Sequence, residues 1–491
     1  MAGKLKIVIL TEGGKDIGMG HITRCASLCQ AFEEKGITPE FVVNGEDVVG
    51  EPVSVSGRGN AIYNWLNDRD RLLSRLAGSD IAVIDSYLAD GDLYKMMAKY
   101  VRLPVYVDDY KRLPYPHGVV LNGSINAEAL DYPSEEGIEY LLGIRYIPLR
   151  KEFWSVAEKD IREEIGSIMV TMGGDDMRNK TPDILRALTE HYPETVKKII
   201  VGKGFKNRGE IDLLKDKKTE LVIHPDAGGM KQVMLESDLA ISAGGQTLYE
   251  LARVGVPTIA ITAADNQLSN MEGWEREGFI TNAGRWDDRN VLDNIIRSIS
   301  LLGDREIRQK KSKIGKSTVD GRGAARVAAY CLRKSLRDTC IIRPAGINDM
   351  HTVYELSNEK EARQNSFNQE NIKFEDHKKW FLQKIADPDC LLLVAEANNS
   401  IIGQARFDMS GDEAVVSISI YKGYRGSGIG TDVLQKALAF LKSSGRRIRA
   451  VNAYVKGGNA SSVRLFEKSG FKFVREFTIK EQNAVHYAYY Y

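Results

Sequence analysis

Short apolar runs alternate with amphipathic stretches along the first two thirds of the chain. Each run is rich in β-branched residues and ends near Gly, Asp or Ser, which is typical of a strand in a parallel sheet followed by a ligand-facing loop. The stretches between the runs carry apolar residues at helical spacing. The alternation predicts an α/β fold, with strands at 5–10, 80–85, 105–108, 168–171, 198–201, 221–224, 239–242 and 258–261.

This series predicts two Rossmann-like lobes that face one cleft, at residues 1–155 and 156–337. The polar stretch 151–164 is the predicted crossing between them. The pattern then restarts, so a third domain is predicted at 338–491, which agrees with the number of domains that 491 residues favour. Its predicted helices begin at 348 and near 375, and its predicted strands lie at 338–344, 391–397, 401–408, 414–420 and 449–455.

Composition and charge narrow the class of protein. Lys plus Arg number 68 and Asp plus Glu 67, for a net charge of +1, which argues against a nucleic-acid binder or a polybasic membrane anchor. The apolar run 7–10 is much shorter than the roughly 18 residues of a membrane span. Five cysteines without a CxxC pair support neither a metal site nor a disulfide framework. We therefore expect a cytoplasmic protein; the sequence indicates no oligomeric state.

The first candidate site is the glycine-rich turn at 18–24, which contains Gly18, Gly20, His21 and Arg24. It follows the first predicted strand and opens a helix whose apolar face carries Ile22, Cys25, Cys29 and Phe32. Free N–H groups at a helix start favour an anion and disfavour a protonated imidazole, so a neutral His21 can serve as a base. The alternative is a histidine that caps or packs the turn. A dinucleotide site is disfavoured because Thr23 replaces the third glycine of that motif.

Glycine-rich turns in the second lobe suit a nucleotide diphosphate. One follows the predicted strand at 239–242 and starts a helix; it contains Gly245, Thr247 and Glu250. Glu250 is placed to accept hydrogen bonds from a ribose. A second turn contains Gly174, and a third polar set contains Asn266. Each turn alone is a weak signal, but three that face one cleft predict nucleotide binding.

These segments, together with the turn at 84–87, resemble the two-lobed GT-B nucleotide-sugar enzymes. The greatest resemblance is to the UDP-2,4-diacetamido-2,4,6-trideoxy-β-L-altropyranose hydrolases of pseudaminic acid biosynthesis, over about residues 4–335. It implies hydrolysis of the anomeric C–O bond with release of UDP and without a metal. It also implies that His21 activates the attacking water, that Tyr87 lines the sugar site and that Asn266 orients sugar or water.

The same resemblance implies how the rest of the substrate is held. The nucleotide is expected on Gly174, Gly245, Thr247 and Glu250, with the uracil on the backbone near Ile223. Gly18, Gly20 and Arg24 are expected to contact the substrate. Tyr87 and Asn266 also have ordinary alternatives, because a Tyr after a strand often packs in a loop and an Asn often caps a helix.

The third predicted domain carries a second phosphate-type loop. Arg425, Gly426, Ser427, Gly428, Ile429 and Gly430 stand between a predicted strand and a helix, where successive N–H groups suit a pyrophosphate. With the downstream segment 459–471, this order resembles the Gcn5-related N-acetyltransferases (GNAT) over about residues 339–491. The resemblance implies acetyl-CoA as cosubstrate, with its pyrophosphate on residues 425–430. It also implies a pantetheine that pairs with Ile418 and Ile420 and bonds to Asn459.

One residue departs from the GNAT pattern. Many members carry a Tyr, taken as the acid that protonates the leaving thiolate, where this chain has Phe466. Another group could replace it, or the thiolate could leave unassisted, since a thiol pKa is near 8.5. The candidate acids are Tyr424, Tyr454, Tyr487 and water, and the candidate bases for the amine are Glu396, His377 and a water chain.

Segments 363–367 and 375–381 resemble acetyltransferases that act on the 4-amino group of a UDP-linked 4-amino-4,6-dideoxy sugar. A polar loop and an amphipathic helix are the alternative explanation of these segments. Acetylation and UDP removal are consecutive steps in the resembled pathway, so the working hypothesis is a bifunctional enzyme. Three alternatives stay open: a GT-B glycosyltransferase fused to an acetyltransferase, a legionaminic or spore-coat counterpart with another sugar isomer, and a sugar-nucleotide sensor.

Overall fold

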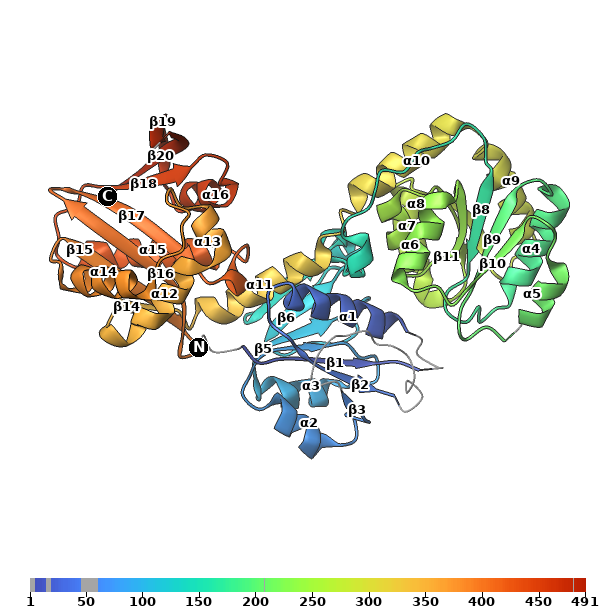
Figure 1. The fold of residues 1–491 in the computed structure, drawn as a ribbon. Helices are drawn as coiled ribbons and strands as arrows, with labels where there is room; N and C mark the ends of the chain where they lie inside the picture. The colour runs from blue at the N-terminus through green and yellow to red at the C-terminus, as the bar shows by residue number, and fades with distance from the viewer. Residues whose placement is uncertain (1–4, 15–18, 46–60, 207, 480) are drawn as a thin grey trace. The chain divides into compact units, whose positions relative to one another are not determined.

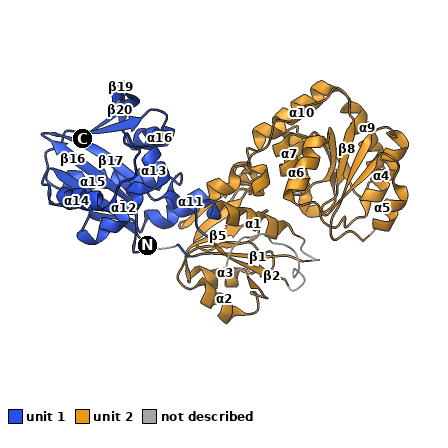
Figure 2. Cartoon of the chain, in the orientation of Figure 1, with its two compact units in different colours: residues 1–6, 32–38, 328–491 blue, residues 7–31, 39–327 orange. Residues whose placement is uncertain are grey.

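The computed structural model describes the chain except for residues 1–4, 15–18, 46–60, 207 and 480 (Figure 1). The chain divides into two compact units (Figure 2). Residues 7–31 and 39–327 form the larger unit, and residues 1–6, 32–38 and 328–491 form the smaller one. Within the described part of the chain, no helix is both long and apolar enough to cross a membrane.

The larger unit begins with a parallel sheet. Its order is β3-β2-β1-β4-β5-β6-β7 in the described residues, so the strand order reverses at β1, between β2 and β4. Loops at the carboxyl ends of strands beside such a reversal are the usual ligand site of an α/β sheet. The strands are β1 (Ile7–Glu12), β2 (Glu40–Asn44), β3 (Ala61–Ile62), β4 (Ser79–Ile84), β5 (Val101–Val107), β6 (Gly118–Asn122) and β7 (Ile138–Leu142). The helices of this lobe are α1 (Gly20–Glu33), α2 (Arg69–Leu76) and α3 (Gly91–Ala98).

A second parallel sheet follows in the same unit, in the order β10-β9-β8-β11-β12-β13, with its reversal at β8. Its strands are β8 (Ser167–Thr171), β9 (Val196–Val201), β10 (Thr219–Ile223), β11 (Leu239–Ala243), β12 (Thr258–Thr262) and β13 (Ile280–Arg285). Alternate residues of β11 enter different cores: Ala240 packs on one face and Ile241 on the other. Helices therefore cover both faces, and the helices of this part are α4 (Lys180–His191), α5 (Arg208–Leu214), α6 (Ala227–Glu236), α7 (Thr247–Val254), α8 (Leu268–Arg276), α9 (Val291–Leu301) and α10 (Arg305–Thr318). The next helix, α11 (Gly323–Arg337), begins in the larger unit and continues into the smaller one.

The smaller unit contains a mixed sheet in the order β14-β15-β16-β17-β18-β20-β19. Its strands are β14 (Ile341–Pro344), β15 (Cys390–Ala397), β16 (Ser400–Ser410), β17 (Glu413–Ile420), β18 (Ala450–Lys456), β19 (Lys472–Ile479) and β20 (Gln482–Tyr490). One face packs on α15 (Ile429–Ser443) and α16 (Ala460–Lys468), and the other carries a smaller core under α12 (Met350–Asn358) and α14 (Phe374–Ala386). A short helix, α13 (Lys360–Gln364), lies between α12 and α14 in the sequence.

The predicted α/β class, with two parallel sheets and a third, mixed one, is confirmed. The predicted apolar face of α1 is buried as well. The predicted strands leave out β2, β3, β6, β7, β13, β19 and β20. A smaller difference is in β1, whose predicted end is residue 10 but which continues through Thr11 and Glu12. β1 lies between two partners, and Glu12 still pairs in register with Asn44 of β2. Polar residues therefore extend a strand that hydropathy alone ends earlier.

Candidate functional site

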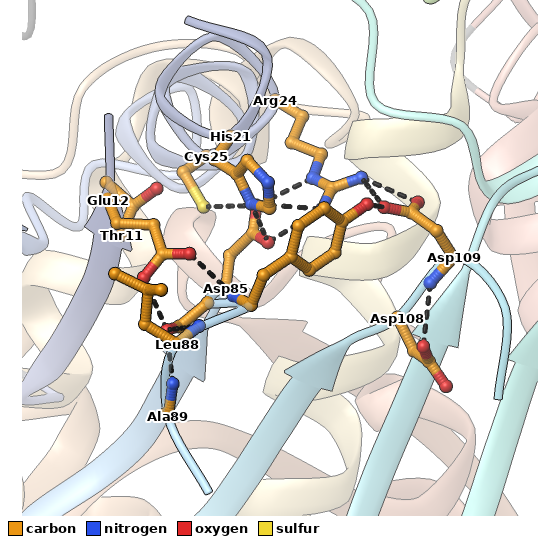
Figure 3. Close-up of polar contacts among 12 residues, drawn as sticks. Thr11, Glu12, His21, Arg24, Cys25, Asp85, Leu88, Ala89, Asp108 and Asp109 are labelled. Atoms are coloured by element: carbon orange, nitrogen blue, oxygen red, sulfur yellow. Dashed lines mark hydrogen bonds and ion pairs between the residues drawn. The ribbon is translucent and has the colours of Figure 1, made fainter. Parts of the chain in front are cut away.

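His21 and Asp85 form a buried hydrogen-bonded pair beside the strand reversal of the first sheet (Figure 3). His21 is the second residue of α1, and Asp85 directly follows β4. Nδ1 of His21 lies 2.6 Å from Oδ1 of Asp85. An ionised carboxylate only accepts hydrogen bonds, so in the neutral imidazole Nδ1 carries the proton and Nε2 carries the lone pair. The imidazole is thus held in the tautomer that a general base needs.

Arg24 keeps Asp85 in its charged form. Its Nε lies 2.6 Å from Oδ2 of Asp85 and its second terminal nitrogen 2.7 Å from Oδ1. Burial raises the pKa of the fully buried Asp85 carboxyl, but the Arg24 guanidinium and then His21 lower it further, so the net pKa is well below its ordinary value. Asp85 is therefore a carboxylate at neutral pH.

Tyr87 connects this cluster to a second carboxylate. Arg24 donates to both oxygens of Asp109, at 2.6 and 2.8 Å, and the Tyr87 hydroxyl also donates to Asp109. The ring of Tyr87 meets His21 edge-on, with centroids 4.3 Å apart. Burial, followed by the Asp109 charge, raises the pKa of Tyr87, so its hydroxyl stays protonated. Tyr87 thus lies beside His21 with its one hydroxyl proton donated to Asp109, and its predicted place in the sugar site stays a prediction.

Hydrogen bonds to Glu12 and Arg112 hold the turn that carries Asp85 and Tyr87. The buried Glu12 accepts from Ser86 Oγ and from the Tyr87 amide, both at 2.5 Å. Arg112 donates to the carbonyl oxygens of Ser86, Tyr87 and Ala89. The cluster also contains Glu12, Asp85, Asp109 and Arg112, for which no role was predicted. Only their positions at the ends of β1, β4 and β5 could have indicated them.

Of the predicted residues on the first turn, Gly18 lies outside the described residues. A Cβ added to Gly20 would lie 4.0 Å from Oε1 of Gln246, the residue before α7. The His21 turn and the glycine-rich turn of the second sheet therefore lie close together within the larger unit. Arg24 is engaged with two carboxylates; its predicted contact with substrate stays a prediction.

The predicted nucleotide turns follow β8 and β11, the strands at the reversal of the second sheet. Gly174 is exposed, and a Cβ there would meet nothing within 4 Å; a Cβ on Gly245 would approach only Gln267, at 3.7 Å. The neighbour Gly244 is the constrained glycine, because a Cβ there would lie 2.8 Å from Met271. No side chain caps α7, and the amides of Leu248 and Tyr249 donate to the carbonyls of Gly245 and Gln246, so an anion at this turn must use the amides that precede Leu248.

Glu250 lies in the first turn of α7 and is buried. Its two oxygens accept from Nε and a terminal nitrogen of Arg150, each at 2.7 Å. Each carboxylate oxygen has a second lone pair, so a ribose hydroxyl could still donate to it. Asn266 is exposed in a short helix, Asp265–Gln267, after β12, and Ile223 ends the edge strand β10 with 43% of its surface exposed. Their predicted roles are not contradicted and stay predictions.

In the smaller unit the predicted phosphate loop joins β17 to α15. Gly426 and Gly428 have φ of +74° and +95°, a conformation that favours glycine, and the Ser427 hydroxyl accepts from the Ile429 amide at 3.3 Å. The Arg425 guanidinium donates to the Ile420 carbonyl and to Glu361, and the Arg425 amide donates to the Lys422 carbonyl, so the predicted contact of Arg425 with the cofactor stays a prediction. Ser427 is buried and its hydroxyl bonds within the loop. The first residues of α15 are Ile429 and Gly430.

β17 and β18 separate beside this loop. Their parallel pairing covers Glu413–Val415 against Ala450–Asn452 and then stops. The edge of β17 that carries Ile418 and Ile420 has no strand partner on this side within the described residues. An extended chain can add to such an edge through main-chain hydrogen bonds. Asn459 caps α16 by accepting from the Ser462 amide at 3.1 Å, which leaves its side-chain NH2 group as a donor.

The candidate acids and bases of this unit differ in accessibility. Phe466 is buried against Phe471. Tyr424 and Tyr487 are also buried, and Tyr454 is 40% exposed. Two candidate bases have structural partners: Glu396 binds Arg343 at 2.8 Å, and Nε2 of the buried His377 lies 3.2 Å from the Met350 carbonyl.

Comparison with known proteins finds a family match in two segments of the chain. The model of the Glycosyltransferase family 28 C-terminal domain matches residues 167–278, and that of the Acetyltransferase (GNAT) family matches residues 350–471. Among solved structures, a spermidine N-acetyltransferase from Vibrio cholerae in complex with CoA and spermine aligns with 31% of this chain and 96% of its own, at 18% identity and a TM-score of 0.29.

Three relatives match different shares of this chain. Uncharacterized protein MJ1062 of Methanocaldococcus jannaschii is 23% identical over 95% of this chain and 97% of its own. Spore coat polysaccharide biosynthesis protein SpsG of Bacillus subtilis is 21% identical over 66% of this chain and 97% of its own. A Helicobacter pylori protein, Pseudaminic acid cytidylyltransferase and UDP-2,4-diacetamido-2,4,6-trideoxy-beta-L-altropyranose hydrolase, is 24% identical over 56% of this chain and 48% of its own.

The first of these relatives spans both units, whereas the other two match only part of this chain. This chain therefore joins a sugar-nucleotide domain of the glycosyltransferase family 28 C-terminal type to an acetyltransferase domain of the GNAT family.

Proposed function

We propose that the chain is a bifunctional enzyme of amino-sugar nucleotide metabolism. Its GNAT domain acetylates the 4-amino group of a UDP-linked 4-amino-4,6-dideoxy sugar with acetyl-CoA. Its larger unit then hydrolyses the UDP-2,4-diacetamido-2,4,6-trideoxy sugar at the anomeric carbon. The observation that carries the hydrolytic half is the buried His21–Asp85 pair, and a relative that matches 56% of this chain carries that hydrolysis in its name.

In the hydrolytic step, Nε2 of His21 removes a proton from water. The water oxygen forms a bond to the anomeric carbon while the bond between that carbon and the phosphate oxygen breaks. The electron pair of the broken bond leaves with UDP. Asp85 keeps the imidazole in the required tautomer and stabilises its positive charge. The hydroxyl of Tyr87 and the amide of Asn266 position the sugar.

The departing diphosphate is held by groups on the second sheet. Backbone N–H groups at Gly174, Gly245 and the start of α7 donate to its oxygens, and the dipole of α7 favours the negative charge. Glu250 accepts from the ribose, and the backbone at Ile223 reads the uracil. Because UDP is already a fair leaving group, the unit's main task is to place one water and exclude other acceptors.

In the acetyl-transfer step, residues 425–430 hold the pyrophosphate of acetyl-CoA through backbone N–H groups. The free edge of β17 pairs with the pantetheine, and the side-chain NH2 of Asn459 donates to the cofactor arm. This arrangement directs the thioester into the gap between β17 and β18, where an amine can reach it.

A glycosyltransferase is the second candidate function for the larger unit. The family matched at 167–278 is named for glycosyl transfer, and the Bacillus subtilis relative is named for a coat polysaccharide. A transferase releases UDP only when an acceptor other than water is present. UDP release from the diacetamido substrate in buffer alone therefore separates the two functions.

The test is the rate of UDP release from UDP-2,4-diacetamido-2,4,6-trideoxy-β-L-altropyranose. We expect His21→Ala to lower it by about 10²–10⁴-fold, the usual contribution of a general base, while acetyl transfer continues. His191→Ala, at an exposed position late in α4, is the matched control and should retain the wild-type rate. Equal rates in wild type and His21→Ala would refute the proposed role of His21 in the hydrolysis.

A further inference from the structure

A polar relay lies on β17, β18 and β20 of the acetyltransferase domain. Nδ2 of the buried Asn452 donates to Oε2 of Glu413 at 2.9 Å, and Oδ1 of Asn452 lies 2.7 Å from Nε2 of His486. A carboxylate only accepts, so the Asn452 nitrogen must face Glu413 and its oxygen must face His486. His486 therefore donates from Nε2.

This relay leaves the other ring nitrogen of His486 as a bare acceptor. With the proton on Nε2, the neutral imidazole carries its lone pair on Nδ1. Nδ1 is buried and has no hydrogen-bond partner among the described residues. Buried acceptors without partners are uncommon in folded proteins, and each one calls for an explanation. A ligand group that donates a hydrogen bond to Nδ1 would explain this unpaired acceptor.

The relay lies where β17 and β18 separate. Val415↔Asn452 is the last pair of their ladder, and the β17 edge proposed to bind the pantetheine begins directly after it. Val451 and Ala453 point into the core with α15, so the Asn452 side chain is on the opposite face of the sheet. Val415 and Ser417 of β17 are exposed, which leaves room for an acceptor on this face.

The groups around His486 favour its neutral form. Tyr454 of β18 faces it across the ladder, with ring centroids 4.9 Å apart, and Arg475 of β19 pairs with it on the other side. Glu413 acts from β17 through Asn452. Burial, followed by the Arg475 charge, lowers the pKa of His486, and the opposing effect of Glu413 is smaller. The ring is therefore an unprotonated base at neutral pH.

We propose that His486 is the general base of acetyl transfer, with Asn452 and Glu413 as positioning residues. This inference rests on the proposed acetyltransferase activity and assigns a residue that the sequence did not indicate. Nδ1 takes one proton from the acceptor ammonium, and the resulting amine attacks the thioester carbonyl. The C–N bond forms, the C–S bond breaks, and the second amine proton goes to the thiolate. The proton on His486 then passes to solvent.

The test is the pH dependence of kcat/KM for the UDP-4-amino-4,6-dideoxy sugar with acetyl-CoA. In the wild type the acidic limb should lie below pH 6.5, the ordinary pKa of histidine. His486→Gln must take its free amine from solution, so its kcat/KM should be about 10²-fold or more lower at neutral pH and rise with pH. His351→Gln, at an exposed position of α12, is the matched control and should retain the wild-type profile.

Two further measurements separate this role from a purely structural one. The Kd of acetyl-CoA should be equal in wild type and His486→Gln, and the nitrogen-15 spectrum of the wild type should show the Nε2–H tautomer. An unchanged pH profile in His486→Gln, or the Nδ1–H tautomer, would overturn the proposal. A wild-type enzyme that leaves the amine unacetylated would instead refute the proposed activity, together with this role.

Discussion

Asp85 and His21 are 64 positions apart in the sequence, and Oδ1 of Asp85 lies 2.6 Å from Nδ1 of His21. The same carboxylate binds the Arg24 guanidinium. This shared contact fixes the charge of Asp85 and, through it, the tautomer of His21. The proposed hydrolysis depends on that arrangement more than on His21 alone.

Asp85→Asn should therefore lower UDP release without unfolding the protein. The amide can donate to Nδ1, which favours the tautomer with the proton on Nε2, and that nitrogen can then no longer accept a proton from water. We expect a loss of about 10²–10⁴-fold in kcat. The rate of UDP release in Asp85→Asn is compared with that in Asp92→Asn, where the carboxylate is exposed on α3. A wild-type rate in Asp85→Asn would contradict the assigned role.

Glu250→Gln should weaken nucleotide binding. Removal of the charge breaks the ion pair with Arg150 and weakens the bond to the ribose, so KM should rise by about tenfold with little change in kcat. Arg150→Gln breaks the same ion pair but leaves the carboxylate, so its KM should change much less. If both variants raise KM equally, Glu250 acts only through the ion pair.

Gly428→Ala should impair acetyl-CoA binding. Gly428 precedes α15 with φ of +95°, and a Cβ there would lie 3.2 Å from Cδ of Arg333. Gly445 has φ of +75° with nothing within 4 Å, so Gly445→Ala imposes backbone strain alone, about 1–2 kcal/mol. Calorimetry should give a Kd for acetyl-CoA about tenfold or more higher in Gly428→Ala only. Equal Kd values would remove the phosphate loop from this role.

Lys159 should make stability depend on pH. Burial lowers its pKa to about 8, against an ordinary value of about 10.4, and its ammonium donates to the Leu235 carbonyl. Between these two pKa values the unfolded chain binds more protons than the folded chain. The free energy of unfolding therefore increases as the pH rises. Urea unfolding at about pH 7 and about pH 10 should therefore show the wild type gaining stability relative to Lys159→Met. If the difference in stability between wild type and Lys159→Met is the same at both pH values, the shifted pKa of Lys159 is contradicted.

The sequence predicted strands of each sheet because hydropathy reports strands that are buried, but it did not predict β2, β3, β6, β7, β13, β19 and β20. It failed at Thr11 and Glu12, where the partners of a central strand keep polar residues in the sheet. The glycine-rich turns and His21 could be found because their chemistry is local, and the structure places the Gly20 turn beside Gln246.

The rest of each candidate site arises from contacts between distant segments. Asp109 is 85 positions from Arg24, and His486 is 34 positions from Asn452. No spacing or periodicity connects such residues; only the order of strands in the sheet brings them together. Glu396 and His377 have the right chemistry for a base, but the fold gives them structural partners.

The most direct test of the bifunctional account follows both products in oxygen-18 water. The purified chain receives acetyl-CoA and UDP-4-amino-4,6-dideoxy-N-acetyl-β-L-altrosamine, and mass spectrometry follows the nucleotide and the sugar with time. We predict that the substrate first gains one acetyl group and that free diacetamido sugar and UDP then appear, with no heavy oxygen in UDP, because the bond at the anomeric carbon breaks. Acetylation with no release of UDP, or heavy oxygen in UDP, would contradict the account.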